Sequence, residues 1–355
     1  MMCNEIQRPL AEICSRYPQD QIVVVLDRRV AYETAYPTLR LEVSEEHKDL
    51  STLTQIWDFF FAHHLTRSGL VICIGGGVLT DMAGLAAAMY KRGVDYVNIP
   101  TTLLSMVDAS SGGKTAINYH GLKNSIGVFA EPVETLICPN WLHTLPAEQL
   151  LSGYAEMLKT GLIEDNVQSD NVQCTKDNVQ GTKESLWNRL LNYDLEALDE
   201  QSLAPLIADC VAVKTQIVSS DPHEQGARKA LNFGHTFGHA LEEVTGYGLR
   251  VTGTMPHGYA VLYGMIAELY LSVTRLGCPR EPLQHLTQLM LHYCGKPQCK
   301  CSDREQLIAL MQQDKKNERA AEINCTLIRS IGEPVINQVI TPDEAAEAFD
   351  YLFSL

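Results

Sequence analysis

The stretch GLVICIGGGVLTDMAG at residues 69–84 decides the fold class of this 355-residue chain. Its first half is an apolar run of the length that a buried strand requires, and it ends in glycines before a helix of small residues. Such a turn lets a phosphate approach the backbone N–H groups at a helix N-terminus. However, Thr80 occupies the place of the third glycine of the dinucleotide fingerprint, so a plain tight turn fits the stretch equally well.

The same order of strand and helix recurs on both sides of this stretch. Strands are predicted at residues 21–27, 69–77 and 94–101, and helices at residues 51–65 and 80–93. Because strands joined through helices by short turns pair in parallel, we predict a parallel, Rossmann-like sheet with helices on its faces. This α/β domain is placed at residues 1–146. Asp27, at the end of the first strand, is suited to accept hydrogen bonds from the hydroxyls of a nucleotide ribose.

Beyond Pro146 the pattern changes to long helical periods, such as EQLLSGYAEMLKTGLIED at residues 148–165, and no clear strand run follows. We therefore predict a mostly α-helical domain at residues 147–355. Within it, residues 165–183 contain the tetrapeptide DNVQ three times. That tract has too few apolar side chains to order itself, so we predict a surface insertion there.

Composition excludes several classes of function. The chain has 43 acidic and 28 basic residues, a formal charge of −15, which argues against nucleic acid or a membrane surface as a partner. We find no signal peptide and no apolar run of membrane-spanning length. The 11 cysteines are an odd number and are scattered, as expected of reduced thiols in a cytoplasmic protein.

Two glycine-rich and basic segments suit an anionic ligand. SGGKTAIN at residues 111–118 is similar to a P-loop, but Asp108 stands where the first glycine of that motif belongs. We therefore reject the interpretation of this segment as the P-loop of a nucleoside triphosphatase. What remains is Asp108 with Lys114 in a Ser/Gly loop, joined by Lys123 and Asn124 further along the chain.

The segment LNFGHTFGHALEE at residues 231–243 predicts a metal site. His235 and His239 are four residues apart and share one face of a helix, and His257 precedes a further apolar helix. Glu156 lies within an apolar helix that would not bury an unpaired carboxylate. Two histidines, one carboxylate and an open position describe a catalytic zinc site, but spacing alone does not decide which histidines bind.

These motifs together resemble the 3-dehydroquinate synthase family. VDASSGGKTAIN at residues 107–118 and NFGHTFGH at residues 232–239 are specific to the sugar-phosphate cyclases, and LKN and DKK favour this family among them. The similarity runs from about residue 69 to residue 332, in the family's order of motifs. It implies the two-domain fold with a helical second domain.

The resemblance also implies site residues. The ligands of Zn²⁺, or of Co²⁺, are Glu156, His235 and His257. NAD contacts fall on Glu45, Lys48, Gly75, Gly76, Gly77, Asp81, Thr101, Thr102 and Thr144, besides Asp27. Substrate contacts fall on Arg92, Lys114, Lys123, Asn124, Lys214, Glu224, Arg228, Asn232, His239 and Lys316, and catalytic roles on Lys159, His239, Lys114, Asp108 and Asn232. One departure concerns the cofactor: Arg29 stands where an asparagine usually supports the nucleotide ribose.

The implied activity is a phosphate-eliminating cyclisation in the shikimate route to aromatic amino acids. Transient oxidation by NAD, elimination of phosphate, re-reduction and an intramolecular aldol step would convert 3-deoxy-D-arabino-heptulosonate 7-phosphate to 3-dehydroquinate. Arg92 matches an arginine that reaches the neighbouring subunit's site, which implies a homodimer. The alternatives are a cyclase for another sugar phosphate, a metal-dependent polyol dehydrogenase on the same scaffold and a non-catalytic relative.

Overall fold

The chain forms two compact units, each built from two segments. The computed structural model describes residues 1–355 except 3–4, 111, 121, 165–183, 247–254 and 314–321. The first unit comprises Met1–Gly153 and Leu198–Thr215, and the second comprises Tyr154–Ala197 and Gln216–Leu355. The predicted insertion at 165–183 therefore lies outside the described residues.

A five-stranded parallel sheet forms the centre of the first unit. Its strands, in the order β2-β1-β3-β4-β7, are β2 (Thr38–Leu41), β1 (Ile22–Asp27), β3 (Leu70–Gly75), β4 (Asp95–Pro100) and β7 (Glu134–Thr135). All neighbouring pairs run parallel. Every residue of β1 and β3 is buried, as expected of strands covered on both faces. The predicted Rossmann-like α/β class is thus confirmed.

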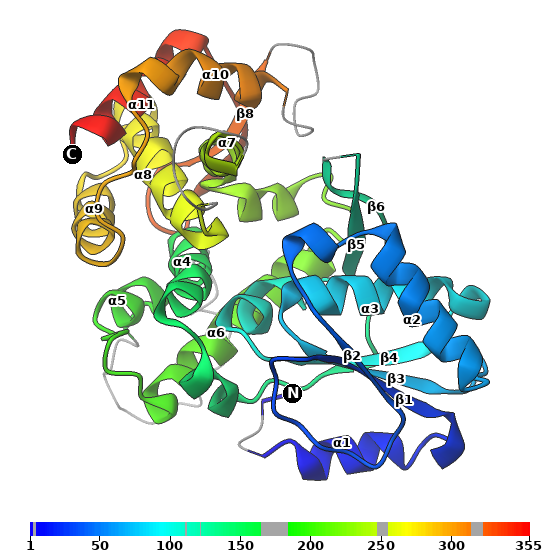
Figure 1. The fold of residues 1–355 in the computed structure, drawn as a ribbon. Helices are drawn as coiled ribbons and strands as arrows, with labels where there is room; N and C mark the ends of the chain where they lie inside the picture. The colour runs from blue at the N-terminus through cyan, green and yellow to red at the C-terminus, as the bar shows by residue number, and fades with distance from the viewer. Residues whose placement is uncertain (3–4, 111, 121, 165–183, 247–254, 314–321) are drawn as a thin grey trace, which may run out of the picture. The chain divides into compact units, whose positions relative to one another are not determined.

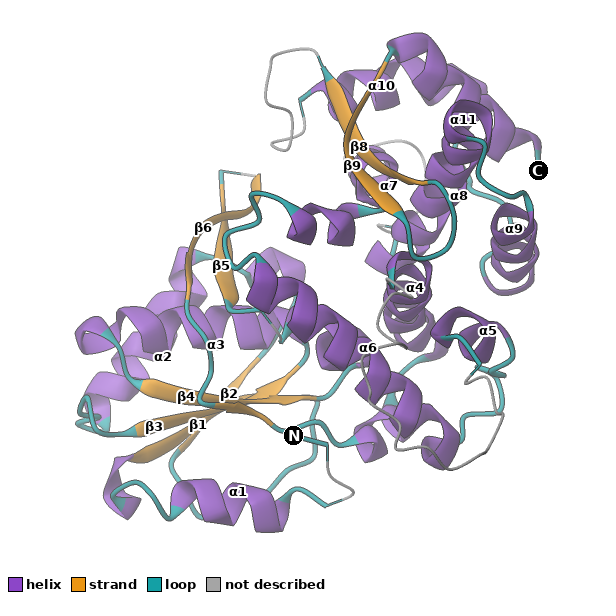
Figure 2. Cartoon of the chain, turned by 180° about the vertical axis from the view of Figure 1, so that it is seen from behind, coloured by secondary structure: helices purple, strands orange, loops and turns teal. Residues whose placement is uncertain are grey.

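Helices cover both faces of this sheet (Figures 1 and 2). Helix α1 (Gln7–Cys14) lies on one face, and α2 (Leu50–Ala62) and α3 (Gly77–Met89) lie on the other. Successive strand residues point to opposite faces, so β1 divides its side chains between two cores. Val23 and Val25 pack with α2 and α3, whereas Val24 packs with α1.

An antiparallel hairpin leaves the sheet after β4. It consists of β5 (Lys114–Tyr119) and β6 (Leu122–Phe129), and all eight residues of β6 are exposed. Short helical turns in this unit are η1 (Gln19–Gln21), η2 (Glu45–His47), η3 (Tyr90–Arg92), η4 (Ser105–Ala109) and η5 (Pro139–Thr144). The sequence did not indicate strands β5 and β6, because neither is a continuous apolar run.

The second unit is mostly helical around the buried helix α8 (His257–Leu276), which packs against α7, α9, α11 and β8. The other helices of this unit are α5 (Leu186–Leu191), α7 (His235–Gly246), α9 (Glu281–Tyr293), α10 (Arg304–Gln312) and α11 (Pro342–Ser354), with the turns η7 (Ala227–Asn232) and η8 (Cys301–Asp303). Helices α4 (Ala147–Ile163) and α6 (Glu200–Ser220) pass from one unit to the other along the chain.

One expectation for the second unit was wrong. An antiparallel hairpin, β8 (Ile323–Ile328) with β9 (Pro334–Ile340), contradicts the absence of strands beyond residue 147. Its strands are short and carry polar residues, so their periodicity does not separate them from the helices around them. The unit remains mostly α-helical, as predicted.

Helix α6 is the one described helix that is long and apolar enough to cross a membrane by length and composition. Core helices of soluble proteins share these properties, so the predicted lack of a membrane partner stays a prediction.

Candidate metal and nucleotide sites

Three predicted metal ligands meet in the second unit. Glu156 lies in α4, whereas His235 and His257 are the first residues of α7 and α8. One ligand atom from each residue lies within 4.8 Å of the others. Oε1 of Glu156 is 3.5 Å from Nε2 of His235 and 3.6 Å from Nε2 of His257, and the carboxylate is 1% exposed. A buried carboxylate facing two imidazole nitrogens fits a divalent metal ion such as Zn²⁺.

The far nitrogen of each ring is held by a hydrogen bond. Nδ1 of His235 lies 3.1 Å from the carbonyl oxygen of Phe233, and Nδ1 of His257 lies 3.2 Å from Oε2 of Glu242. When Nδ1 of a neutral ring donates to these oxygens, its Nε2 keeps the lone pair that can bind a metal ion. This is the arrangement by which metal-binding histidines are oriented.

His239 lies beside the three ligands without belonging to their group. Its ring centroid is 5.4 Å from that of His235 and 6.4 Å from that of His257. The sequence left open which histidines bind a metal, and the geometry groups His235 and His257 with Glu156. His239 remains close enough to meet a ligand held by that group.

Charges around Glu156 keep it ionised despite its burial. Burial alone would raise the pKa of Glu156, but the adjacent ammonium of Lys159 and the ring of His257 lower it to about 2. For His257, burial acts to lower the pKa, and hydrogen bonds to Glu156 and Glu242 outweigh it and raise the pKa to about 10. The site therefore holds a carboxylate with cations around it. A bound metal ion would take over part of the positive charge that these cations supply.

A polar loop in the same unit holds further predicted site residues. Nδ2 of Asn232 donates to Oε1 of Glu224 at 2.8 Å, and Nη1 of the buried Arg228 donates to the carbonyl oxygen of Pro222 at 2.7 Å. The carboxylate of Asp221 accepts hydrogen bonds from the backbone N–H groups of Gln225, Gly226 and Arg228. These bonds lower the pKa of Asp221 and fix the loop that carries Arg228.

The glycine turn of the first unit begins helix α3. Gly76 is the N-cap of α3 and offers no side-chain cap, so the first N–H groups of the helix are left to an anion. Added Cβ atoms at Gly76 and Gly77 would lie 3.1 Å from Thr102 and 2.8 Å from Ala109. Side chains at these positions would crowd the turn. Because both residues are glycines, the backbone stays accessible, as a nucleotide phosphate requires.

Predicted nucleotide contacts gather near the start of α3. Nζ of Lys48 donates to Oδ2 of Asp81 at 2.6 Å and to Oδ1 of Asn124 at 2.5 Å. Burial raises the pKa of Asp81 to about 6, although Lys48 opposes the rise. Glu45 accepts a hydrogen bond from Asn118 at 2.8 Å. Charged groups of both signs are thus held in place around one end of the sheet.

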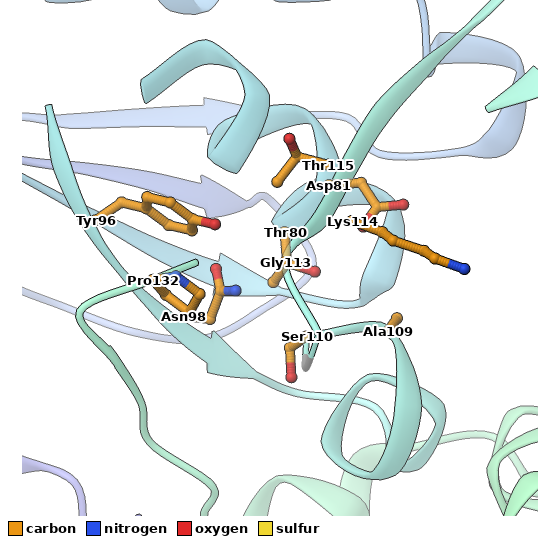
Figure 3. Close-up of a pocket in the computed structure, with 10 residues that line it drawn as sticks. All are labelled: Thr80, Asp81, Tyr96, Asn98, Ala109, Ser110, Gly113, Lys114, Thr115 and Pro132. Carbon is orange, nitrogen blue, oxygen red and sulfur yellow. The ribbon is translucent and has the colours of Figure 1, made fainter. Parts of the chain in front are cut away.

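A small cavity of about 10 Å³ lies between β4, α3 and the loop before β5. Figure 3 shows Tyr96 and Asn98 on one side of it, and Lys114 extending away from them. Its size suits one water molecule rather than a substrate. Next to it, Nζ of Lys214 donates to Oδ1 of Asp108 at 2.6 Å, so these two predicted residues do meet.

The remaining predicted residues are placed as follows. Thr101 is buried, Thr102 faces Gly76, Thr144 donates to the carbonyl oxygen of Trp141, and Arg92 and Lys123 are exposed; Lys316 lies outside the described residues. Sequence reasoning missed Glu242 and Asp221, which contact other site residues rather than an expected ligand. Only the position of Glu242 one turn after His239 gave any signal.

Comparison with known proteins decides the family. The pattern described as "3-dehydroquinate synthase N-terminal" matches residues 38–152, and "3-dehydroquinate synthase C-terminal" matches residues 153–317. A 3-dehydroquinate synthase of Parabacteroides distasonis is 36% identical over 99% of this chain and 96% of that protein. The chain belongs to the 3-dehydroquinate synthase family. A Bordetella pertussis member of the family is 39% identical over 84% of this chain and 78% of its own length.

Solved structures agree on the dehydroquinate synthase fold. ValA, a 2-epi-5-epi-valiolone synthase of Streptomyces hygroscopicus subsp. jinggangensis with NAD⁺ and Zn²⁺ bound, is 24% identical with a TM-score of 0.78, over 99% of this chain and 95% of that one. A 2-deoxy-scyllo-inosose synthase with carbaglucose-6-phosphate, NAD⁺ and Co²⁺ is 23% identical with a TM-score of 0.76, over 96% and 94%. A glycerol dehydrogenase of Schizosaccharomyces pombe is 15% identical with a TM-score of 0.60, over 97% and 85%.

The predicted family, fold and 3-dehydroquinate synthase activity are therefore confirmed. Dehydrogenases share the fold, but the relatives at 34–39% identity are 3-dehydroquinate synthases. A sugar phosphate is the substrate that this activity implies.

Proposed function

We propose that this chain converts 3-deoxy-D-arabino-heptulosonate 7-phosphate to 3-dehydroquinate and inorganic phosphate, using NAD and a divalent metal ion. The observation that carries the proposal is the convergence of Glu156, His235 and His257, with each Nδ1 engaged and each Nε2 directed at the carboxylate. The solved relatives with NAD⁺ and Zn²⁺ or Co²⁺ support the same cofactors here.

Glu156, His235 and His257 would hold the metal ion in the second unit, and the glycine turn with Asp81 and Lys48 would hold the nucleotide in the first. When bound, the metal lowers the pKa of a substrate hydroxyl, and NAD accepts and returns a hydride, so the net redox change is zero.

The chain's own residues would position the substrate and move protons. Arg228, Lys214 and Lys114 supply cations for its carboxylate and phosphate, because charge-assisted hydrogen bonds to oxyanions are strong. Lys159 and His239 lie next to the metal ligands and are suited to relay protons, a contribution of about 10²–10⁴-fold to the rate. Asp108 and Asn232 would orient these groups. Holding one flexible intermediate for ring closure contributes up to about 7–11 kcal/mol in well-oriented reactions.

The test is to supply the metal-loaded protein with the heptulosonate phosphate and a catalytic amount of NAD⁺. We expect many equivalents of phosphate per NAD⁺ without accumulation of NADH, and 3-dehydroquinate as product. NADH formed in proportion to substrate would contradict the proposal in favour of a polyol dehydrogenase. Loading with Zn²⁺ or Co²⁺ in parallel identifies the more active metal.

We also propose that the protein is a cytoplasmic homodimer in which Arg92 serves the neighbouring subunit's site. Arg92 is exposed and has φ of 68°, an uncommon left-handed conformation that the fold must stabilise. Mixing an Arg92→Ala variant with an inactive Lys159→Met variant should restore activity in mixed dimers. Activity no higher than that of the two separate variants would contradict the shared site.

A further inference from the structure

Arg29 changes the charge and the hydrogen-bonding groups at the place where the nucleotide ribose is proposed to bind. Asp27 ends β1, which pairs with β3, and a Cβ on Gly75 in the glycine turn would lie 3.3 Å from Cβ of Asp27. In dinucleotide-binding sheets, an acidic residue at the end of the strand beside the glycine turn binds the ribose 2′-hydroxyl and so selects NAD. An arginine at that place instead accommodates the 2′-phosphate of NADP.

In this chain the carboxylate of Asp27 is occupied by Arg29. Oδ1 of Asp27 accepts hydrogen bonds from the backbone N–H of Arg29 at 3.0 Å and from its Nε at 3.1 Å. Oδ2 accepts from Nη2 of Arg29 at 2.7 Å. The two-bond contact neutralises the charge that would repel a 2′-phosphate, and it leaves the carboxylate less able to accept from a ribose hydroxyl.

The rest of the Arg29 guanidinium remains available to a ligand. Nη2 also donates to the carbonyl oxygen of Val43 at 2.9 Å, which fixes the plane of the group. Among the described residues, Nη1 has no hydrogen-bond partner, and the Arg29 side chain is 70% exposed. The N–H groups on Nη1 of this fixed and exposed guanidinium can donate one charge-assisted hydrogen bond to a phosphate oxygen.

Glu42, the acidic residue near Arg29 other than Asp27, does not occupy the Arg29 guanidinium. The hydrogen bond to Asp27 raises the pKa of Arg29 and the charge of Glu42 adds to the rise, but Oε2 of Glu42 is held by Nη1 of Arg28 at 2.7 Å. Asp27 and Arg29 thus form one neutral pair, and Arg28 and Glu42 form another.

We propose that Arg29 lets this enzyme bind NADP⁺ as well as NAD⁺, with the Nη1 side of its guanidinium on the 2′-phosphate. This inference rests on the proposed function, because it assumes that the nucleotide lies on the glycine turn. It adds a nucleotide specificity to that function, determined by one residue that departs from the family's usual asparagine.

The experiment is calorimetric titration of the metal-loaded, nucleotide-free protein with NAD⁺ and with NADP⁺ at constant ionic strength. We expect dissociation constants within about tenfold of each other. Arg29→Asn should weaken the affinity for NADP⁺ by about 10- to 100-fold, since one charge-assisted contact is lost, and should change the affinity for NAD⁺ little. Arg29→Lys, which keeps the charge without the fork, should fall between the two.

The matched control is Arg28→Asn, which removes an equal charge from the adjacent position and should leave both affinities unchanged. If the unaltered protein bound NAD⁺ but bound NADP⁺ more than about 100-fold more weakly, the inference would be overturned and the proposed function would stay intact. Equal loss of both nucleotides in Arg29→Asn would also overturn it, because Arg29 would then only support the fold. If neither nucleotide bound the unaltered protein, both proposals would fail.

Discussion

At the scale of single residues, the two candidate histidine ligands differ in what holds them. His235 has a neutral backbone carbonyl at its Nδ1, whereas His257 has the carboxylate of Glu242. A carboxylate on the far nitrogen makes an imidazole a more basic ligand and fixes its ring orientation. The site therefore depends on Glu242, although Glu242 lies outside the group of ligand atoms.

Glu242→Gln should weaken metal binding. The amide oxygen can still accept from Nδ1 of His257, but the negative charge that increases the ring's basicity is lost. Removal of such partners costs about 10–100-fold in metal affinity. Competition for Zn²⁺ against a chelator of known affinity measures this, and the exposed neighbour Glu243→Gln is the control. Equal affinities for the two variants would show that Glu242 does not support the ligand.

His235→Ala and His239→Ala should separate metal binding from catalysis. We expect His235→Ala to lose both bound zinc and turnover, because it removes one of three ligands. His239→Ala should retain its zinc and lose turnover, because its ring lies beside the ligand group without joining it. Metal content measured beside phosphate release distinguishes them. Zinc retained by His235→Ala would mean that the ligands are wrongly assigned.

Spacing in the sequence could not assign these histidines for a physical reason. His235 and His239 share a helical face, so both could approach one ion. The choice depends on where α4 and α8 bring Glu156 and His257, and those contacts join residues far apart in the chain. Only the family resemblance proposed the same set in advance.

At the scale of elements, close packing between α7 and α8 brings the two histidines together. Both helices begin with a histidine, and α7 follows Gly234, whose φ of +81° favours glycine. A Cβ on Gly264 of α8 would overlap the carbonyl oxygen of Gly234 and lie 2.7 Å from the backbone nitrogen of Gly238. The ligand geometry therefore depends on a contact that has no room for a methyl group.

Gly264→Ala should destabilise the protein and weaken its metal binding together. Overpacking of this kind costs about 1–3 kcal/mol in the free energy of unfolding, and relief requires α7 to move away with His235. Gly277→Ala is the comparison, because nothing lies within 4 Å of its Cβ and only its left-handed φ of +72° is strained. Denaturant unfolding and zinc competition measure the two effects. Unchanged metal affinity in a destabilised Gly264→Ala would mean that α7 and His235 do not move.

The elements differ in how well the sequence predicted them. Strands β1, β3 and β4 were all predicted. β1 and β3 are buried throughout and are almost entirely apolar, whereas β4 is buried after Asp95 and includes the polar Asn98. The hairpins β5–β6 and β8–β9 were not predicted. Strand β6 reads LKNSIGVF with every residue exposed, so tertiary pairing rather than local pattern makes it a strand.

At the scale of the whole molecule, the formal charge of −15 conflicts at first with a doubly anionic sugar acid as substrate. Net charge describes the long-range field. The cations predicted to bind the substrate act at short range; they are Arg92, Lys114, Lys214 and Arg228. Acids compensate some of the predicted cations within each unit: Asp108 pairs with Lys214, and Glu156 pairs with Lys159. The two descriptions predict opposite responses to salt, because screening weakens whichever field dominates.

We expect kcat/KM for the heptulosonate phosphate to fall as ionic strength rises from about 0.01 M to 0.15 M, where the screening length shortens from about 30 Å to 8 Å. Local attraction by the site cations would then outweigh repulsion by the acidic surface. Glu347→Lys, on the exposed side of α11, changes the net charge by two and should leave the slope against salt unchanged. Arg228→Met, which removes a proposed substrate cation, should flatten the slope. A kcat/KM that rises with salt would show that the net charge controls the approach of the substrate.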